Sequence, residues 1–265
     1  MSEEEKLATM KAQVYKDPRP PEAFARFHAR TRAKEPNAMY ELVRMVLWPM
    51  VLLFFRGRCI SSDKVPASGP VILAPNHFSN MDHFLMATFI RRRVNFVAKS
   101  QLFKGGLLEK VFHNGGVFPV RRGHRDEEAF ITMHGVLKRG GAIVMYAEGG
   151  RSRTGELADR VKPGIGRLAL ESGAPVVPVA IYGSAKARNW KQGRLPKVTV
   201  QYGDPFRYEQ VSDPTRERQQ AAAEEIFADI RDLYTELERH GRKGMVARVR
   251  RQRRDERRSR SAATA

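Results

Sequence analysis

Short apolar runs alternate with longer stretches of helical periodicity between residues 61 and 240. The apolar runs are rich in β-branched residues and predict buried strands at 71–74, 94–98, 117–120, 142–146, 176–181 and 198–202. Apolar residues recur at helical spacing between and after them, at 83–91, 126–139, 165–171 and 216–238. Strands that alternate with helices predict an α/β domain with a mixed, largely parallel sheet flanked by helices.

The pattern changes on either side of this segment and divides the chain into three parts. Residues 1–60 are an N-terminal lead-in, polar and proline-bearing to about residue 36 and strongly apolar after it. Residues 61–240 form the α/β domain, with no internal repeat and no sign of a second core. Residues 241–265 are basic and lack apolar periodicity, so we expect a disordered tail there.

The longest apolar run, MVLWPMVLLFF at residues 45–55, lies between Arg44 and Arg56. As a helix it would extend about 16 Å, roughly half of the ~30 Å hydrocarbon core of a bilayer, so it is too short to span one. Extended back to residue 39 it becomes an amphipathic, membrane-associating helical segment, whose inserted side chains would include Leu47, Trp48, Leu52 and Phe54. A buried core helix explains the same composition, and both interpretations stay open.

The charge of the chain points to an anionic partner. Its 48 Lys and Arg residues against 29 Asp and Glu give a net charge of +19, and residues 241–265 carry ten basic residues against two acidic ones. Nucleic acid, an acidic membrane surface and a small phosphorylated ligand all fit this charge, while a merely solvated tail explains the last segment as simply. The lone Cys59 and the acidic, polar N-terminus favour a reducing, cytosolic setting without a signal peptide.

The loop after the first predicted strand carries a candidate acid–base pair. Ligands and catalytic groups gather beyond the carboxyl ends of strands in such sheets. His77 follows the strand directly and Asp82 opens the next helix, so the loop can fold the carboxylate onto the imidazole. A carboxylate on one ring nitrogen fixes the tautomer and leaves the other nitrogen free to take a proton. Asp82 as a plain helix cap is the simpler alternative, and His83 is expected to point elsewhere.

Two further loops at the same sheet edge are rich in glycine and arginine. The loop after residues 142–146 contains Glu148, Gly149, Gly150, Arg151 and Ser152, followed by Arg153. Glycines let the backbone approach a ligand closely, and arginine binds phosphate oxygens through paired hydrogen bonds. The strand at 117–120 leads into Arg121-Arg122-Gly123. Either cluster alone reads as a surface turn, but three polar loops at one edge indicate a ligand site.

Several other templates fail. Residues 164–169 match the loose dinucleotide pattern G-x-G-x-x-A, but no strand precedes them. No phosphate-binding G-x-x-x-x-G-K-[ST] loop, no G-x-S-x-G nucleophile elbow and no zinc-ligand spacing occurs in the sequence.

Four ordered blocks resemble the glycerolipid acyltransferases, specifically the 1-acylglycerol-3-phosphate acyltransferase type. Residues 76–82 match the family pattern N-H-x-x-x-x-D, and residues 115–121 fit G-x-x-F-x-x-R through Gly115, Phe118 and Arg121. Residues 148–152 are similar to E-G-T-R-S, and residues 177–179 look like V-P-V. The sequence departs from the family at Gly150, where threonine is usual, and at Tyr146-Ala147, where phenylalanine-proline is common.

The resemblance implies a reaction and assigns roles to residues. Such enzymes pass an acyl group from acyl-CoA or acyl carrier protein to the free hydroxyl of 1-acylglycerol-3-phosphate, making phosphatidic acid. His77 would be the general base, oriented by Asp82. The acceptor would be held by the glycine- and arginine-bearing loops, through Arg121, Glu148, Gly149, Gly150, Arg151 and Ser152. The resemblance calls for no metal and no cofactor, and it does not identify the donors that would stabilise an oxyanion.

The expected partners are the acyl donor, a lysophospholipid acceptor and an anionic membrane surface, with no nucleic acid. We expect a peripheral protein on the cytoplasmic face of the cell membrane. Three alternatives stay open: an acyltransferase for another lysolipid or for glycerol-3-phosphate, a basic nucleic-acid-binding protein, and a catalytically silent lipid-binding module.

Overall fold

A computed structural model describes residues 17–122, 126–152, 154–186 and 196–264. In these ranges seven strands form one sheet in the order β1-β7-β6-β2-β5-β3-β4. Neighbouring strands run parallel except for the β6–β7 pair, which is antiparallel. The predicted mixed, largely parallel sheet is therefore confirmed. The strands are β1 (Arg58–Ile60), β2 (Val71–Pro75), β3 (Asn95–Lys99), β4 (Val117–Val120), β5 (Ala142–Val144), β6 (Val176–Tyr182) and β7 (Thr199–Tyr202).

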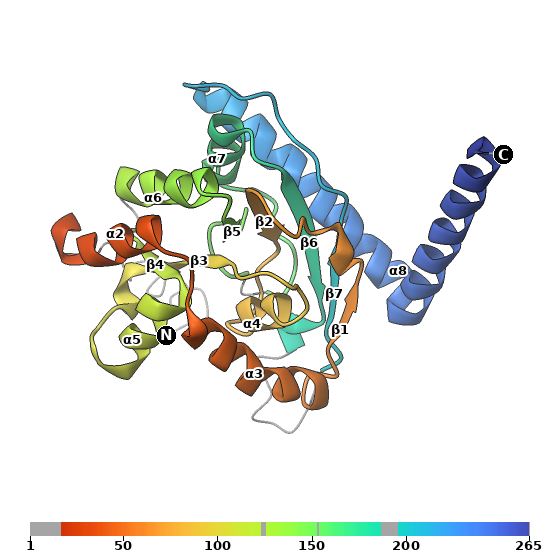
Figure 1. Cartoon of the computed structure of the whole chain (residues 1–265), viewed down its shortest axis with the longest axis horizontal. Coiled ribbons are helices and arrows are strands. Elements are labelled where there is room, and N and C mark those ends of the chain that lie inside the picture. Colours follow the sequence, from red (N-terminus) through yellow and green to blue (C-terminus); the bar gives the residue numbers. More distant parts are fainter. Residues whose placement is uncertain (1–16, 123–125, 153, 187–195, 265) are drawn as a thin grey trace, which may run out of the picture.

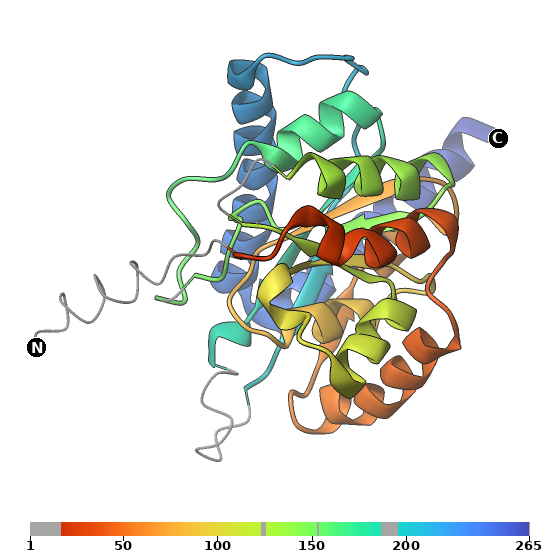
Figure 2. The same cartoon turned by 90° about the vertical axis from the view of Figure 1, so that its left-hand side faces the viewer.

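Helices cover both faces of the sheet (Figures 1 and 2). On one face lie α3 (Ala38–Leu53), α4 (Asp82–Ala87) and α5 (Gly106–Gly115). The other face carries α6 (Glu127–Lys138), α7 (Gly164–Ser172) and the first half of α8 (Arg216–Thr264). Helix α2 (Ala25–Ala33) packs beside β4 and α6, and short 3-10 turns occur at η1 (Pro21–Phe24), η2 (Ser62–Lys64) and η3 (Ser100–Leu102).

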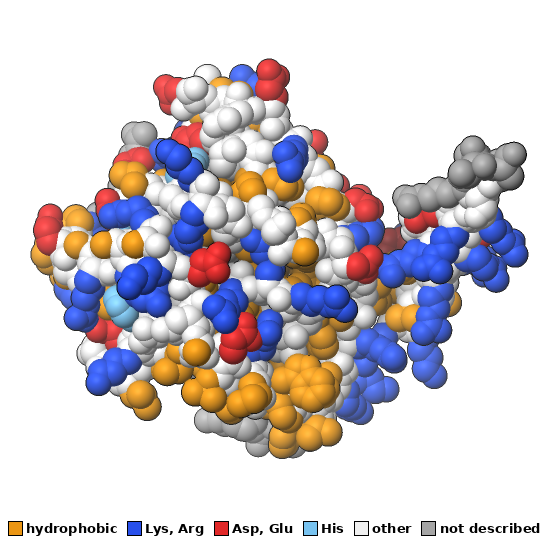
Figure 3. All heavy atoms as spheres, in the orientation of Figure 1, with side chains coloured by type: hydrophobic (Ala, Val, Ile, Leu, Met, Phe, Trp, Pro, Cys, Tyr) orange, Lys and Arg blue, Asp and Glu red, His pale blue; other side chains and the backbone are white. Residues whose placement is uncertain are grey.

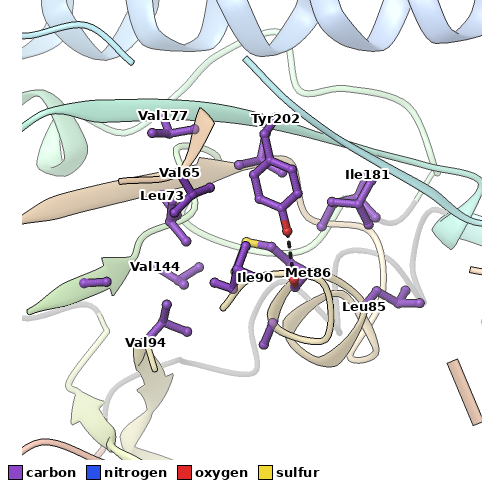
Figure 4. Close-up of a cluster of buried hydrophobic side chains, with 14 of the residues drawn as sticks. Val65, Leu73, Leu85, Met86, Ile90, Val94, Val144, Val177, Ile181 and Tyr202 are labelled. Carbon is purple, nitrogen blue, oxygen red and sulfur yellow. Dashed lines mark hydrogen bonds between the residues drawn. The ribbon is translucent and has the colours of Figure 1, made fainter. Parts of the chain in front are cut away.

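The alternation of side chains along β2 divides the core between these two layers. Leu73 belongs to the cluster under α3 and α4, whereas Ile72 belongs to the cluster under α6, α7 and α8. Figure 4 shows the first cluster, in which the Tyr202 hydroxyl donates a 2.8 Å hydrogen bond to the carbonyl of Met86. Because strands of a parallel sheet are buried on both faces, their sequences read as continuous apolar runs, which is why they could be predicted.

The sequence pattern missed β1 and α5. Strand β1 has three residues at the sheet edge, and of these only Ile60 is buried, so it carries no apolar run. Helix α5 begins after Gly105 and ends at Gly116, both with positive φ, and exposes the apolar side chains of Leu107 and Leu108. Its apolar residues therefore do not mark a core-facing stripe.

The predicted disordered tail at 241–265 is wrong, because α8 continues to Thr264. Gly241, at φ 61° and ψ 173°, turns the chain, and a second helical stretch follows. Its first turns pack on the body through Met245, Val246 and Val249. The Arg242 guanidinium donates hydrogen bonds to the carbonyl oxygens of Arg56 and Val198 and to the hydroxyl of Thr199. Arginine, alanine and glutamate favour helix, so a few anchoring contacts suffice without a long apolar stripe.

The apolar segment at 39–55 forms α3, with Pro49 inside the helix. No helix in the described part of the chain is both long enough and apolar enough to cross a bilayer. The large apolar side chains that α3 and the residue after it expose are Leu42, Met45, Val46, Trp48, Leu53 and Phe54. Two of the side chains expected to insert, Leu47 and Leu52, are instead half-buried.

Candidate active site

The three polar loops leave the sheet at the same edge, because β2, β4 and β5 are linked by parallel pairings. The exit of β2 is fixed by the buried side chain of Asn76. Its Oδ1 accepts a 2.7 Å hydrogen bond from the Ile181 amide, and its Nδ2 donates to the Ile181 carbonyl at 3.2 Å. The next residue, His77, therefore leaves the sheet from a rigid position.

Asp82 folds back onto the His77 ring, as the sequence predicts. His77 Nδ1 lies 2.9 Å from Asp82 Oδ2, and the amides of Phe78 and Ser79 each donate to the same oxygen at 2.7 Å. Asp82 is fully buried and is the first residue of α4. Its carboxylate thus closes the preceding loop as well as orienting the imidazole.

This contact sets the chemistry of the His77 ring. The carboxylate accepts from Nδ1–H, so Nε2 is the nitrogen that can take a proton. Burial lowers the pKa of His77 below its ordinary value of 6.5, the hydrogen bond that its ring donates to Asp82 partly offsets that effect, and the charges of Arg151 and Arg122 lower the pKa further. A neutral imidazole with one free nitrogen is the form that acts as a general base near neutral pH.

Glu148 and Ser152 hold the backbone of His77 from the neighbouring loop. Glu148 Oε1 accepts a 2.9 Å hydrogen bond from the His77 amide, and the Ser152 amide donates to the His77 carbonyl at 2.9 Å. Burial raises the pKa of Glu148 to about 7, while the His77 amide counteracts the rise. Both residues thus position the backbone of His77, and their role toward an acceptor stays a prediction.

The two glycines of this loop differ in whether the backbone and its surroundings allow a side chain. Gly149 has a φ of +65°, and a Cβ there would lie 2.6 Å from Lys162 Cγ. Gly150 has no such restriction, because the nearest atom to a Cβ would be Arg122 Nη1 at 3.7 Å. The side chain that this sequence lacks at position 150 would therefore point toward Arg122.

Arg151 and Arg122 bring positive charge to the base, as their effect on the pKa of His77 shows. Arg151 is exposed at the rim. Arg121, which the family pattern selected, uses its backbone amide to donate to Asp126 Oδ2 at 2.6 Å, and its Nε is buried. The sequence signal was the Arg121-Arg122 pair, but it could not tell which member faces the base. Arg153 and Gly123 lie outside the described residues.

Two aromatic residues at the site were missed. The Tyr146 ring stacks on the His77 ring, with centroids 3.9 Å apart and planes inclined by 22°. The Tyr146 hydroxyl lies 2.7 Å from His83 Nδ1, and the His83 ring centroid is 5.2 Å from that of His77. The expectation that His83 points elsewhere is therefore wrong. The first turn of α4 places residues 82 and 83 on adjacent sides of the same imidazole.

An apolar cavity of about 340 Å³ opens beside this aromatic group, between α3, α4, α5 and β3. Most of its lining is aliphatic or aromatic, and its polar side chains include His83, Asn80 and Thr88. The lining residues contributed by α3 and α5 are Tyr40, Val43, Arg44, Leu47, Leu108, Val111, Phe112 and Gly115. The site thus joins the His77–Asp82 pair, a cationic rim and an apolar cavity. Among the described residues no group of His, Cys, Asp or Glu side chains is placed to hold a metal ion.

Comparisons with known proteins agree with this arrangement. Residues 56–182 match the model of the Acyltransferase family. A probable 1-acyl-sn-glycerol-3-phosphate acyltransferase of Mycoplasma genitalium is 30% identical over 55% of this chain, and the match spans about half of that relative, 55% of its length. The 1-acyl-sn-glycerol-3-phosphate acyltransferase of Bacillus subtilis is 25% identical over 71% of this chain and 94% of its own.

The fold also matches a solved structure, the 1-acyl-sn-glycerophosphate acyltransferase PlsC from Thermotoga maritima. The TM-score is 0.51 at 23% identity, over 73% of this chain and 82% of that one. At this identity the likeness supports the fold. The family model lies over β1 to β6 and all three site loops, so residues 56–182 carry an acyltransferase domain, as the resemblance predicts.

Proposed function

We propose that this protein transfers an acyl group from a thioester, acyl-CoA or acyl carrier protein, to the free hydroxyl of 1-acylglycerol-3-phosphate, forming phosphatidic acid. The names of the relatives support this acceptor, and the site supports the reaction class. The observation that carries the proposal is the position of His77. Its ring lies beside an apolar cavity on the His83 side and within the field of two arginines.

The chemistry divides among these parts. His77 Nε2 takes the proton of the acceptor hydroxyl while the hydroxyl oxygen attacks the carbonyl carbon of the thioester. The C–O bond forms, the C–S bond breaks, and the imidazolium returns the proton to the departing thiolate. Asp82 stabilises the imidazolium through Nδ1. Arg122 and Arg151 supply charge for a phosphate, and the apolar cavity takes hydrocarbon.

Gly150 favours a second acceptor as the alternative within the same reaction. A threonine at this position would add a hydroxyl near Arg122, and this chain lacks it. Another lysolipid or glycerol-3-phosphate is therefore the competing acceptor, and the same cationic rim would bind its phosphate.

The test is release of free thiol from acyl-CoA and acyl carrier protein against a panel of acceptors. We expect release that depends on 1-acylglycerol-3-phosphate and a phosphatidic acid product. A preference for glycerol-3-phosphate or another lysolipid would move the acceptor to the alternative. Thiol release without any acylated product would contradict the transferase assignment.

The residue-level arm of the test uses His77→Ala and Asp82→Asn. General-base catalysis contributes about 10²–10⁴-fold, so His77→Ala should lose at least that much kcat. Asp82→Asn should also lose kcat, because the neutral amide no longer stabilises the positive charge of the imidazolium. Thermal unfolding shows whether each variant is folded. A folded His77→Ala protein with more than about a tenth of the wild-type kcat would contradict the general-base role.

We further propose that the protein is peripheral and lies on an anionic membrane surface on the cytoplasmic side. Figure 3 shows apolar side chains gathered over α3, with Lys and Arg side chains along the second half of α8. Trp48 and Phe54 are each about half exposed and Met45 is 67% exposed. These side chains form a large apolar area for a surface in contact with water. Flotation with vesicles of mixed charge tests this location, and failure to float with any composition would contradict it.

A further inference from the structure

We propose that His83 is a second catalytic histidine, whose Nε2–H donates a hydrogen bond to the thioester carbonyl oxygen of the acyl donor and to the oxyanion formed from it. The inference rests on the proposed acyl transfer and adds the group that polarises the carbonyl. Three features of the molecule support this role: the Tyr146–His83 hydrogen bond, the spacing of the two imidazoles, and the place of His83 in the wall of the apolar cavity.

The hydrogen bond from Tyr146 determines which nitrogen of His83 carries the proton. Burial raises the pKa of the Tyr146 hydroxyl well above its ordinary value, so the hydroxyl stays protonated and can donate. Nδ1 accepts the hydrogen bond from the Tyr146 hydroxyl, with 2.7 Å between the oxygen and the nitrogen. A neutral His83 therefore carries its own proton on Nε2. Burial, together with the charges of His77 and the two arginines, lowers the pKa of His83 to about 3, so the ring stays neutral.

A neutral imidazole can serve as an electrophile. Its N–H is a hydrogen-bond donor that does not give up its proton at ordinary pH, and enzymes use such rings to polarise carbonyl groups. Protonation of His83 would compete with its role as acceptor for Tyr146, which is why the neutral form matters. Tyr146 therefore acts as a positioning residue for both rings: its face stacks on His77 and its hydroxyl fixes the tautomer of His83.

The spacing of the two rings fits one reacting carbon. Their centroids lie 5.2 Å apart with planes inclined by 57°, and each hydrogen bond spans about 3 Å. The two rings are thus close enough to reach two oxygens on the same carbon from different sides. His77 would hold the attacking hydroxyl and His83 the carbonyl oxygen.

The cavity sets the direction from which the donor approaches. His83 lines the cavity together with Phe84, Ala87 and Phe96, so its exposed ring atoms face apolar space. An acyl chain in this cavity brings its carboxyl end to the polar part of the wall. In the reaction the carbonyl π electrons move onto oxygen as the C–O bond forms, His83 Nε2–H stabilises that charge without transferring its proton, and the electrons return as the C–S bond breaks.

The test compares His83→Gln with His83→Met, two side chains of similar size of which only glutamine can donate a hydrogen bond. Loss of one oxyanion donor costs about 10²–10³ in kcat, so we expect that loss for His83→Met, with KM for the acyl donor changed by less than about threefold. His83→Gln should retain at least tenfold more kcat than His83→Met. Equal kcat for the two variants, or His83→Met within threefold of wild type, would overturn the proposal.

Tyr146→Phe tests the same role with the stacked ring kept. Without the hydroxyl the proton of His83 is no longer fixed on Nε2, and we expect kcat to fall about tenfold with an unchanged KM. An unchanged kcat would overturn the proposal, and this arm decides it alone if His83→Met fails to fold. His134→Phe is the control. His134 lies on α6 and bonds to Glu171 of α7, outside the site, so this variant should keep the wild-type kcat.

The outcome for the proposed function is read separately. If the wild-type protein releases no thiol from any acyl donor, the proposed acyl transfer fails and takes this inference with it. If the wild type and His134→Phe transfer acyl groups while His83→Met does so equally well, only the role of His83 is wrong.

Discussion

At the scale of the residue, His77 is held by far more contacts than Asp82 supplies. The amide of His77 donates to Glu148, its carbonyl accepts from Ser152, its Nδ1 faces Asp82 and its ring face lies on Tyr146. Only the Asp82 contact could be predicted from spacing. The others join loops that follow different strands, so they depend on the strand order β2-β5, which no local pattern encodes.

Arg151 should affect both the acceptor and the pH profile. Its positive charge lowers the pKa of His77, so Arg151→Ala should raise that pKa and move the acid limb of kcat/KM to higher pH. A charge-assisted hydrogen bond contributes about 1.5–3 kcal/mol, so acceptor kcat/KM should fall roughly ten- to a hundredfold. Initial rates from pH 5 to 8 measure both effects.

Arg160→Ala provides the control for this prediction, because Arg160 is an exposed arginine of the following loop and is not assigned to the site. Arg160→Ala should leave both the pH of the acid limb and the value of acceptor kcat/KM unchanged. If Arg151→Ala lowers acceptor use without moving the acid limb, the residue binds acceptor away from His77. An acid limb that moves to lower pH in Arg151→Ala would contradict the prediction that the Arg151 charge lowers the pKa of His77.

Glu148 should make the protein less stable as the pH rises. Its folded pKa of about 7 lies above the ordinary value of 4.5, so the folded state binds this proton more tightly than the unfolded state. The stabilisation is complete below about pH 4.5 and is lost as the pH rises through 7. Glu148→Gln keeps an oxygen for the His77 amide and removes the buried charge, so it should be more stable than wild type at pH 8, by on the order of 2 kcal/mol.

Urea unfolding of wild type and Glu148→Gln at pH 5 and pH 8 measures this difference. The other titrating groups are common to both proteins and cancel in the comparison. A difference in stability that is the same at both pH values would show that the Glu148 carboxyl is not perturbed in the folded protein.

At the scale of the element, the apolar runs predicted the strands that are buried on both faces. The pattern failed for elements whose apolar side chains line the cavity or face solvent instead of packing into the core. Helix α5 lines the cavity and exposes Leu107 and Leu108, so its apolar positions follow no single core stripe. Helix α4 was predicted, but the position of residue 83 on it was not considered. Residue 83 follows Asp82 by about 100° of helical turn, which brings it to the same imidazole.

The rejected dinucleotide pattern at residues 164–169 has a structural explanation in helix packing. A Cβ on Gly166 would lie 2.0 Å from the Gln219 carbonyl oxygen and 2.8 Å from the Ala223 amide, because α7 and α8 are in close backbone contact. Gly166→Ala should therefore destabilise the protein by about 1–3 kcal/mol or more, since backbone must move. Thermal unfolding measures the loss.

Gly115→Ala is the matched comparison within another helix. No atom lies within 4 Å of a Cβ there, so the substitution should leave the melting temperature unchanged or slightly raised. Equal melting temperatures for the two variants would contradict the close approach of α7 and α8.

At the scale of the whole molecule, charge and apolar surface are placed on separate elements. The second half of α8 extends away from the sheet and carries most of the basic excess of the last segment (Figures 1 and 3). Two of its arginines pair with the body: Arg248 with Glu236 at 3.1 Å, and Arg253 with Asp63 at 2.6 Å. These pairs and the hydrogen bonds of Arg242 orient the helix, and five further arginines between residues 250 and 258 are exposed.

The exposed arginines form one stripe, which we define as Arg250, Arg251, Arg254, Arg257 and Arg258. Counted from Arg250, the others follow at one, four, seven and eight residues, which places all five on one side of the helix. Each contributes about 1 kcal/mol near an anionic surface. Replacing all five with glutamine should weaken binding to anionic vesicles at least tenfold and flatten its salt dependence, since fewer counterions are displaced. Vesicle co-sedimentation between 50 and 300 mM salt measures both.

The apolar and electrostatic contributions can be separated by a second variant. Trp48→Ser with Phe54→Ser should weaken binding to neutral and anionic vesicles alike, because burial of apolar surface does not depend on lipid charge. The arginine-stripe variant should lose only the anionic part and should keep wild-type kcat on detergent-solubilised substrates, since none of its arginines lies at the site. If single-stranded RNA displaces the wild-type protein from anionic vesicles at equal charge concentration, and the stripe variant loses RNA binding first, the stripe serves nucleic acid rather than the membrane.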